Sequence, residues 1–329
     1  MPLDLEKNIV FVDVSYLVFY RFFALKKWFK FAYKDIDTTA EDYKWLENTV
    51  FMEKYQKTLL DTVTKIAKQK KVPFGNIVFC YDCHFKDNWR LKHCRPKAAE
   101  ECIAYKGDRK SMLKKQGFSD YKVFDLVEST YLPEFSNTHS NLILKHKNAE
   151  ADDCIALAIK ELINKKNYTK TIWIVASDYD YVQLCNQQIH LIDLKRKQLD
   201  EVQLADNNLN NVEYLIRKIM IGDKSDNISP SQFNPDKVAE VNQLCGTKLR
   251  KNKAGVYNVT EATFNKIKEC PDVWNPLVGY FNTNKTVLKS SKAATANNVE
   301  TCLIGSVFDL NQRLIDFDLI PSKIKVKIC

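Results

Sequence analysis

Three short apolar segments, separated by helical patterns, constrain the fold of this chain more than any other feature. The segments are NIVFV (residues 8–12), NIVFCY (76–81) and TIWIVAS (171–177), and each is rich in β-branched residues. Runs of this length and composition predict buried strands. Amphipathic patterns such as YQKTLLDTVTKIAKQKK (55–71) and DDCIALAIKELINKK (152–166) predict helices between them. The alternation predicts an α/β fold: a Rossmann-like, mostly parallel sheet with helices on both faces.

Aspartates follow each of the three predicted strands within a few residues. Asp13 follows the first strand, Asp82 the second, and the pair Asp178 and Asp180 the third. In open α/β sheets, ligands bind beyond the carboxyl ends of the strands. We therefore expect these carboxylates to gather at one edge of the sheet.

Two further acidic groups lie at predicted helix ends. The sequence EADD (150–153) begins a helix, where capping of exposed N–H groups explains one acidic residue but not three. The sequence GDKSDNIS (222–229) directly follows the apolar run YLIRKIMI (214–221). Its composition is typical of a solvated turn after a helix. The turn nevertheless adds Asp223 and Asp226 to the acidic residues near predicted element ends.

Nine carboxylates in such positions would repel one another unless cations neutralise them. Oxygen ligands without clustered His or Cys suit Mg²⁺, with Mn²⁺ as a substitute. Two such ions can clamp the attacking and leaving oxygens of a phosphodiester and activate a water molecule. The candidate metal-binding residues are Asp13, Asp82, Glu150, Asp152, Asp153, Asp178, Asp180, Asp223 and Asp226.

The composition excludes several other kinds of site. The chain has 8 Gly and neither G-x-G-x-x-G nor G-x-x-x-x-G-K-[ST], which argues against a nucleotide-cradling loop. It also lacks G-x-S-x-G and H-E-x-x-H, and its 5 His are scattered. A formal net charge of +9 favours an anionic partner such as nucleic acid or an acidic membrane surface. The chemistry is therefore expected to depend on carboxylates.

Cysteine usage and the N-terminal sequence indicate an intracellular setting. The 10 Cys have no regular spacing, and Asp4 and Glu6 stand where a secretory leader would be basic. The aromatic segment 14–33 is interrupted by charges, among them Arg21 and Lys26, so we predict no transmembrane helix.

Basic residues form a second candidate element. The segment 84–115 contains ten Lys or Arg against four acidic residues, with Trp89 and Tyr105 between them. A solvated helical face is the usual explanation, but directly after Asp82 such a segment can guide a single strand and stack a base. The later sequence TKLRKNK (247–253) can contact phosphates. The candidate nucleic-acid-binding residues are Arg90, Tyr105, Lys110, Lys248, Arg250 and Lys251.

Six motifs in order resemble the flap endonuclease and 5′-3′ exonuclease family. They are FVDVS, FCYD, YKGDR, AEADDCIAL, ASDYDYVQL and IMIGDKSDNI, spread between residues 8 and 230. A later sequence, QRLIDFDLIP (312–321), resembles the family's post-nuclease segment. Members of the family include the 5′-nuclease domain of bacterial DNA polymerase I and the phage enzymes that remove RNA primers. The match to the phage enzymes is compatible with a viral source.

The resemblance implies a PIN-like nuclease core over residues 1–230, with a helical arch at about 84–120, and a helical DNA-binding region over 231–329. It implies that the nine carboxylates bind two Mg²⁺ ions, and that Lys106 and Arg109 contact the scissile phosphate as catalytic residues. Tyr105 matches a position that stacks on a nucleobase. The implied activity is hydrolysis of phosphodiester bonds at 5′ single-strand/duplex junctions. The implied partners are DNA with 5′ flaps, overhangs or RNA primers, together with replication or repair proteins, and no membrane.

The sequence departs from the family in two places. After residue 229, relatives continue with a Gly-rich helix-turn-helix that grips duplex DNA, partly through a potassium ion. Here the sequence PSQFNPDKVAEVNQLCG (230–246) lacks the Gly-x-Gly pattern, which puts the potassium site in doubt. The segment from Asp82 to Tyr105 is also longer than expected, so the shape of the arch is open.

Three alternatives remain at the level of sequence. A haloacid dehalogenase-like phosphatase needs a second Asp two residues after the first, where this chain has Ser15. A zinc module fits no regular ligand spacing; its ligands would come from Cys80, Cys83, His84, His93, Cys94 and Cys102. A catalytically silent nuclease fold that serves as a DNA-binding or scaffold protein would be expected to lack some of the acidic residues, yet all are present.

Overall fold

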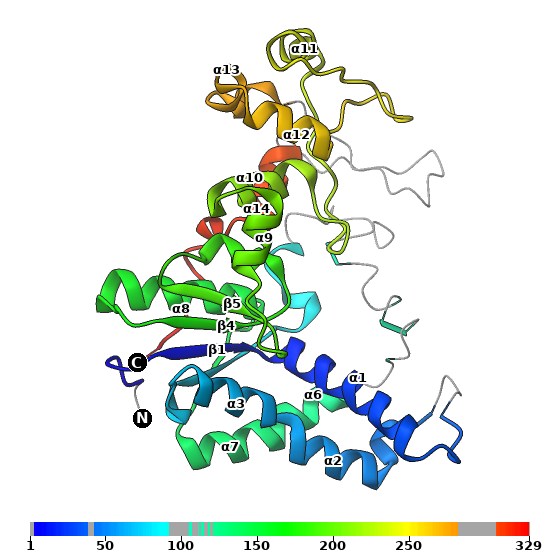
Figure 1. Ribbon diagram of the computed structural model, residues 1–329, viewed down its shortest axis with the longest axis vertical. Coiled ribbons are helices and arrows are strands. Elements are labelled where there is room, and N and C mark those ends of the chain that lie inside the picture. Colours follow the sequence, from blue (N-terminus) through cyan, green and yellow to red (C-terminus); the bar gives the residue numbers. More distant parts are fainter. Residues whose placement is uncertain are drawn as a thin grey trace. The chain divides into compact units, whose positions relative to one another are not determined.

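A computed structural model describes residues 3–38, 43–91, 105–106, 111, 113–114, 118, 121–281 and 307–328. The chain forms two compact units (Figure 1). Unit 1 comprises residues 1–88, 112–211 and 321–329, and unit 2 comprises 89–111 and 212–320.

Unit 1 is built on a parallel five-stranded sheet in the order β3-β2-β1-β4-β5. The central strand β1 pairs with β2 through Val10 and Ile77, and with β4 through Val10 and Trp173. The strands are β1 (Ile9–Asp13), β2 (Ile77–Tyr81), β3 (Leu142–Lys145), β4 (Ile172–Val175) and β5 (Ile189–Ile192). The three predicted strands are present, and the structure adds β3 and β5.

Side chains on alternate strand positions face two different helical layers. Val10 and Val12 of β1 join a core with Phe79 of β2 and the helices of one layer. Cys80 faces the other layer, where it lies near Cys154 of α8 (Ala151–Lys166). The first layer contains α1 (Val14–Ala32), α2 (Thr49–Leu59), α3 (Asp61–Gln69), α6 (Lys122–Leu126) and α7 (Leu132–His139). Figure 1 shows these layers on opposite sides of the sheet, which confirms the predicted fold class.

The aromatic segment that begins at Val14 is a packed helix. Asp13 caps α1 by accepting a hydrogen bond from the backbone N–H of Tyr16. Leu17, Phe22 and Phe29 recur at helical spacing and are buried in the core. Among the described helices, none combines the length and the apolar character that crossing a membrane requires.

Unit 2 is mainly helical in its described part. Its helices are α10 (Asn211–Ile221, which begins at the unit boundary), α11 (Val238–Cys245), α12 (Glu261–Lys268), α13 (Pro271–Trp274) and α14 (Val307–Ile315). In unit 1, α9 (Asp200–Asn207) follows β5. Short segments of 3-10 or π helix occupy Trp45–Glu47, Phe74–Asn76, Phe85–Asp87, Val127–Tyr131, Tyr179–Leu184, Pro235–Lys237, Leu277–Tyr280 and Phe317–Leu319.

The division between the units differs from the predicted boundary at residue 230. Asn311 of α14 donates hydrogen bonds to the carbonyls of Ile219 (2.9 Å) and Ser229 (2.7 Å). These buried bonds join α10 and the turn after it to α14, so the acidic turn belongs to the later unit. Residues 321–328, in contrast, belong to unit 1. Most of the predicted arch, including 92–104 and 107–110, lies outside the described residues.

Candidate acidic functional site

Seven of the nine candidate carboxylates lie at the carboxyl edge of the sheet in unit 1. They follow β1, β2 and β4 or begin α8, the helix that comes after β3. Because all five strands are parallel, their carboxyl ends meet at this edge. The acidic edge consists of Asp13, Asp82, Glu150, Asp152, Asp153, Asp178 and Asp180.

Asp13 is held between the first turn of α1 and the turn after β4. One carboxylate oxygen, Oδ1, accepts the backbone N–H of Tyr16 at 3.0 Å. The other, Oδ2, accepts the hydroxyl of Tyr181 at 3.2 Å. Two donors from separate elements therefore fix the carboxylate at the end of the central strand.

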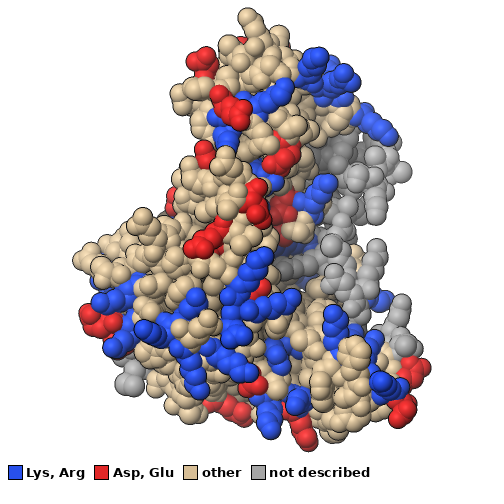
Figure 2. Space-filling view, viewed as in Figure 1, with Lys and Arg blue, Asp and Glu red and all other residues tan. Residues whose placement is uncertain are grey.

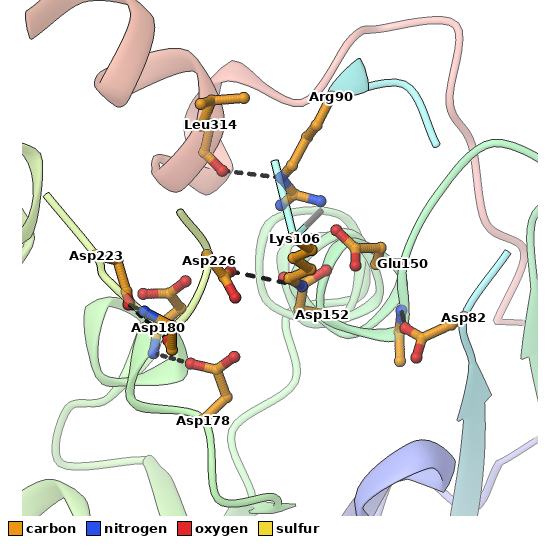
Figure 3. A network of polar contacts seen from close by, with 12 residues as sticks. Asp82, Arg90, Lys106, Glu150, Asp152, Asp178, Asp180, Asp223, Asp226 and Leu314 are labelled. Carbon is orange, nitrogen blue, oxygen red and sulfur yellow. Dashed lines mark hydrogen bonds and ion pairs between the residues drawn. The ribbon is translucent and has the colours of Figure 1, made fainter. Parts of the chain in front are cut away.

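Asp82 is fixed in a similar way at the end of β2. Its Oδ2 accepts the hydroxyl of Ser15 at 2.5 Å. Its Oδ1 accepts the backbone N–H of Ala151 at 2.8 Å (Figure 3). Ser15 stands where a phosphatase of the haloacid dehalogenase type would need a second Asp, and here it orients Asp82 instead. The bonds join β2 to α1 and to α8.

The start of α8 combines capping with a buried acidic group. Asp153 is fully buried and accepts the backbone N–H of Glu150 at 3.0 Å, which forms half of a capping box. Asp152 accepts the backbone N–H of Asp153 at 2.6 Å. Helix capping therefore accounts for Asp153. This agrees with the expectation that capping explains one acidic residue of the EADD sequence.

Asp178 and Asp180 belong to the turn that follows β4. Asp178 caps this turn by accepting the backbone N–H of Asp180 at 2.9 Å (Figure 3). Asp180 is 7% exposed, and the next residue, Tyr181, is fully buried. The buried side chain of Tyr181 therefore anchors the turn in the core.

Burial and nearby carboxylates together raise the pKa of two groups at this edge. Burial and the carboxylates of Glu150, Asp82 and Asp153 raise the pKa of the Cys83 thiol to about 12. Burial and the charge of Asp13 also raise the pKa of the Tyr181 hydroxyl well above its ordinary value. Neither group ionises near neutral pH, so both act as neutral neighbours of the carboxylates.

The carboxylate oxygens of the acidic edge are ligands of the kind that a hard divalent cation prefers, although they do not surround a single position. Among the residues that the structure describes, no three His, Cys, Asp or Glu side chains converge on a single metal position. Carboxylate oxygens have several lone pairs, so an oxygen that accepts one hydrogen bond can still bind a cation. The alternative zinc module fits less well, because Cys80 lies fully buried inside β2 and burial raises the pKa of its thiol. Its candidates His93, Cys94 and Cys102 lie outside the described residues.

The other two candidate carboxylates belong to a tight turn in unit 2. The backbone groups of Asp223 and Ile228 pair in both directions, at 2.9 and 2.7 Å. Gly222 has φ +76°, and a Cβ there would lie 2.4 Å from the carbonyl oxygen of Ile228. The close approach of these two backbone segments therefore requires glycine.

Lys218, in the last turn of α10, controls the ionisation of Asp223. Its Nζ lies 2.8 Å from Oδ2 of Asp223, and Ser225 donates two hydrogen bonds to Oδ1. Burial raises the pKa of Asp223, but Lys218 and Ser225 outweigh this and lower the pKa to about 2. Lys218 was not among the site residues predicted from the sequence. The available signal was a basic residue one helical turn before the acidic turn.

Lys106 joins the same turn through Asp226. The backbone N–H of Lys106 donates to the carbonyl of Asp226 at 2.9 Å, and its Nζ lies 3.6 Å from Oδ2 (Figure 3). Both side chains are largely buried, at 7% and 11% exposed. The two motifs that contain them, far apart in the sequence, thus meet within unit 2. Arg109 and Lys110 lie outside the described residues.

Arg90 and Tyr105 are placed differently from the surface positions that nucleic-acid binding requires. Arg90 is 2% exposed, and its Nε donates to the carbonyl of Leu314 at 2.8 Å (Figure 3). Its guanidinium lies over the rings of Trp89 and Tyr105, and Tyr105 is itself buried. In this conformation both side chains pack inside unit 2, and their contact with nucleic acid stays a prediction. Sequence could not reveal a partner 224 residues away.

The remaining basic candidates are exposed in the loop between α11 and α12. Lys248, Arg250 and Lys251 face solvent, while Asn242 anchors the loop by accepting hydrogen bonds from Thr247 and Leu249. This loop therefore presents its charges on an ordered backbone.

The described fold is similar to that of phage 5′ nucleases. The bacteriophage T5 D15 protein, solved with metal ions, has a TM-score of 0.50 and 17% identity over 94% of this chain and 90% of that chain. T5 D15 flap endonuclease, in a pseudo-enzyme–product complex with DNA and metal ions, has a TM-score of 0.46 and 13% identity, over 94% and 89% of the two chains. The catalytic core of Rad2 with a DNA substrate has a TM-score of 0.36 and 15% identity, over 98% and 84%.

These comparisons concern the fold. No protein-family model matches the chain, and no curated protein matches its sequence. At 17% identity the first T5 structure shows the shared fold alone, and the two lower TM-scores add no further argument. The PIN-like 5′-nuclease fold predicted from the motifs is confirmed.

Proposed function

We propose that this chain is a metal-dependent 5′ nuclease that hydrolyses phosphodiester bonds at 5′ single-strand/duplex junctions, as an exonuclease, a flap endonuclease or both. The observation that carries the proposal is the acidic edge. Seven carboxylates follow the strand ends of a 5′-nuclease fold, and hydrogen bonds from three separate elements hold Asp13 and Asp82 in place. A fold gains no stability from placing so many like charges together, which supports a role in binding cations.

The proposed cofactor is Mg²⁺ at two sites, with Mn²⁺ as a substitute. When bound, the two ions would activate water and stabilise the leaving oxygen. Asp13, Asp82, Glu150 and the pair Asp178 and Asp180 supply oxygen ligands from unit 1. Asp152 would assist them, and Asp153 would hold the start of α8 in position. Asp223 and Asp226 are assigned to the second ion by their motif.

The lysines of unit 2 have complementary roles in this proposal. Lys106 would stabilise the negative charge that develops on the scissile phosphate, together with Arg109. Its ion pair with Asp226 helps to position the ammonium. Lys218 keeps Asp223 ionised, and a carboxylate must be ionised to bind a cation.

The proposed substrates are DNA molecules with 5′ flaps, overhangs or RNA primers, and the proposed context is primer removal in replication, or repair. The exposed residues Lys248, Arg250 and Lys251 would contact duplex phosphates in place of the Gly-rich motif that the chain lacks. Tyr105 would reach a nucleobase only after leaving its buried position.

Cleavage of a 5′-labelled flap duplex, with Mg²⁺ and with chelator, tests the proposal. The variants are Asp180→Asn, at the acidic edge, and Asp206→Asn, an exposed residue of α9 in the same unit. We expect Mg²⁺-dependent cleavage at the junction by the wild type and by Asp206→Asn, and loss of cleavage in Asp180→Asn.

A second candidate function is a catalytically silent nuclease fold that binds DNA. It is favoured by one observation: no described group of three candidate side chains converges on a metal position. Flap binding without cleavage by the wild type would establish this alternative and would overturn the enzymatic proposal.

A further inference from the structure

A cluster of positive charge follows β5, at the same edge of the sheet as the carboxylates. Lys195, Arg196 and Lys197, here called the basic turn, are consecutive and exposed. Within the described parts of the chain, none of the three forms an ion pair. Figure 2 shows Lys and Arg side chains gathered over the face of unit 1 that carries β4 and β5 in this view. The basic turn adds to this charge at the carboxyl edge.

Hydrogen bonds order the backbone of the basic turn. Asp193 closes the turn by donating its backbone N–H to the carbonyl of Lys197 at 2.9 Å, and its Oδ1 accepts the backbone N–H of Lys197 at 2.8 Å. Arg196 has φ +72° and donates its backbone N–H to the carbonyl of Asp193 at 2.9 Å. Because the backbone is already ordered, binding through this turn would cost little conformational entropy.

A second anchor connects the basic turn to the acidic edge within unit 1. The backbone N–H of Leu194 donates to the hydroxyl of Tyr16 at 3.1 Å. The backbone N–H of Tyr16 donates in turn to Asp13 at 3.0 Å. The turn is therefore held one side chain away from the carboxylate that ends the central strand.

Among the described residues, no acidic side chain forms an ion pair with the basic turn. The carboxylate of Asp193, the nearest acidic group in sequence, is engaged by a backbone N–H of the turn. A turn with three cations and no aromatic residue fits phosphates better than bases, since base stacking needs an aromatic surface.

We propose that the basic turn binds the phosphate backbone of the duplex part of a nucleic-acid substrate, next to the acidic edge. This inference rests on the proposed function, because it takes nucleic acid as the substrate. The contact is independent of base sequence and would position the duplex beside the acidic edge.

The test compares two triple variants that each lower the formal net charge from +9 to +6. The test variant replaces the basic turn, as Lys195→Gln, Arg196→Gln and Lys197→Gln. The control variant replaces three exposed lysines at the opposite edge, as Lys7→Gln, Lys165→Gln and Lys166→Gln, which precede β1 or end α8. Binding of a labelled flap duplex is measured by fluorescence anisotropy across a salt series, with chelator present to prevent cleavage.

The expected result is a smaller salt dependence for the test variant alone. Each lost phosphate contact reduces the slope of log affinity against log salt by about 0.9, so the slope should change by about 2–3. Affinity at moderate salt should fall about tenfold or more. The control variant should keep the wild-type slope. Single-stranded DNA of the same length should show a smaller difference between the variants.

Each other outcome overturns the inference. Equal slopes for the test and control variants, with wild-type binding intact, would reject the basic turn and leave the proposed function standing. A larger loss on single-stranded DNA than on duplex would reject the assignment to duplex. Failure of the wild type to bind either DNA would reject both the inference and the proposed function. If the triple variant does not fold, the single variants Lys195→Gln, Arg196→Gln and Lys197→Gln provide the same comparison, each with an expected change in slope of about 0.9.

Discussion

The two acidic regions of this protein satisfy their charges in different ways. In unit 1, Asp13 and Asp82 accept hydrogen bonds from hydroxyl and backbone N–H groups, which orient a carboxylate without cancelling its charge. In unit 2, Asp223 and Asp226 are each paired with a lysine ammonium. Hydrogen bonds thus orient Asp13 and Asp82 in unit 1, whereas ion pairs with lysines hold Asp223 and Asp226 in unit 2.

The largest expected effect is from Asp13→Asn. Asparagine keeps an oxygen that can cap α1, so the fold should persist, while one ligand charge is lost. Cleavage should fall by about 10²-fold or more, beyond the 10–100-fold loss that is typical when a residue behind a metal ligand is replaced. The single-turnover rate on a flap duplex measures it, and the melting temperature should stay level or rise as repulsion is relieved. A rate close to that of the wild type would show that Asp13 is not a metal ligand needed for cleavage.

Ser15→Ala tests whether hydrogen bonding positions Asp82. The loss of the 2.5 Å bond should lower the rate by about 10–100-fold and increase the Mg²⁺ concentration needed for half-maximal activity. Ser15→Thr retains the hydroxyl and should restore much of the rate. Thr169→Ala, an exposed hydroxyl in the same unit, is the control. An unchanged Mg²⁺ requirement in Ser15→Ala would show that Ser15 does not position a ligand.

Lys218→Met tests the internal compensation of unit 2 through the pH dependence of stability. The pKa of Asp223 is about 2 in the folded protein, against an ordinary 3.8. A lowered folded-state pKa contributes stability that is full above the ordinary pKa and is lost as the pH falls toward the folded-state value. The variant should therefore lose about 2 kcal/mol at neutral pH in chelator.

The difference between Lys218→Met and the wild type should shrink between about pH 4 and pH 2. Chemical denaturation across this range measures it, with Lys224→Met, an exposed residue of the same turn, as the control. A difference that stays constant with pH would show that the ion pair does not set the ionisation of Asp223.

Gly222→Ala tests whether the turn requires the close approach of two backbone segments. Gly222 and Gly255 both have positive φ, but only at Gly222 would a Cβ meet the backbone, 2.4 Å from Ile228. Each Ala variant should lose about 1 kcal/mol for the left-handed conformation. Gly222→Ala should lose about 1–3 kcal/mol more than Gly255→Ala from the displaced backbone. Equal losses in a denaturant titration would show that the close approach at Gly222 is not required.

The core strands were predictable because their signal is local. The apolar segments that became β1, β2 and β4 are continuous and rich in β-branched residues, so their pattern alone indicates buried strands. LILK (142–145) and IHLI (189–192), which became β3 and β5, are four residues long and contain polar side chains. Such runs become strands only because a neighbouring strand offers them backbone partners.

The acidic edge was predictable for a similar reason, since parallel strands bring residues after their carboxyl ends together. The burial of individual side chains, in contrast, was not predictable from the sequence. Arg90 and Tyr105 look like surface residues in a basic segment, and only contacts with a distant part of the chain bury them. The ion pairs of Lys106 and Lys218 also depend on tertiary structure, although the motif around Lys106 pointed to its importance.

The most direct test of the central claim is a count of bound Mn²⁺ by electron paramagnetic resonance. The account predicts two sites for the wild type and for Asp206→Asn, and loss of at least one site in Asp13→Asn and in Asp180→Asn. No bound Mn²⁺ in the wild type, or the same number of sites in all four proteins, would contradict the claim that the acidic edge exists to hold divalent cations.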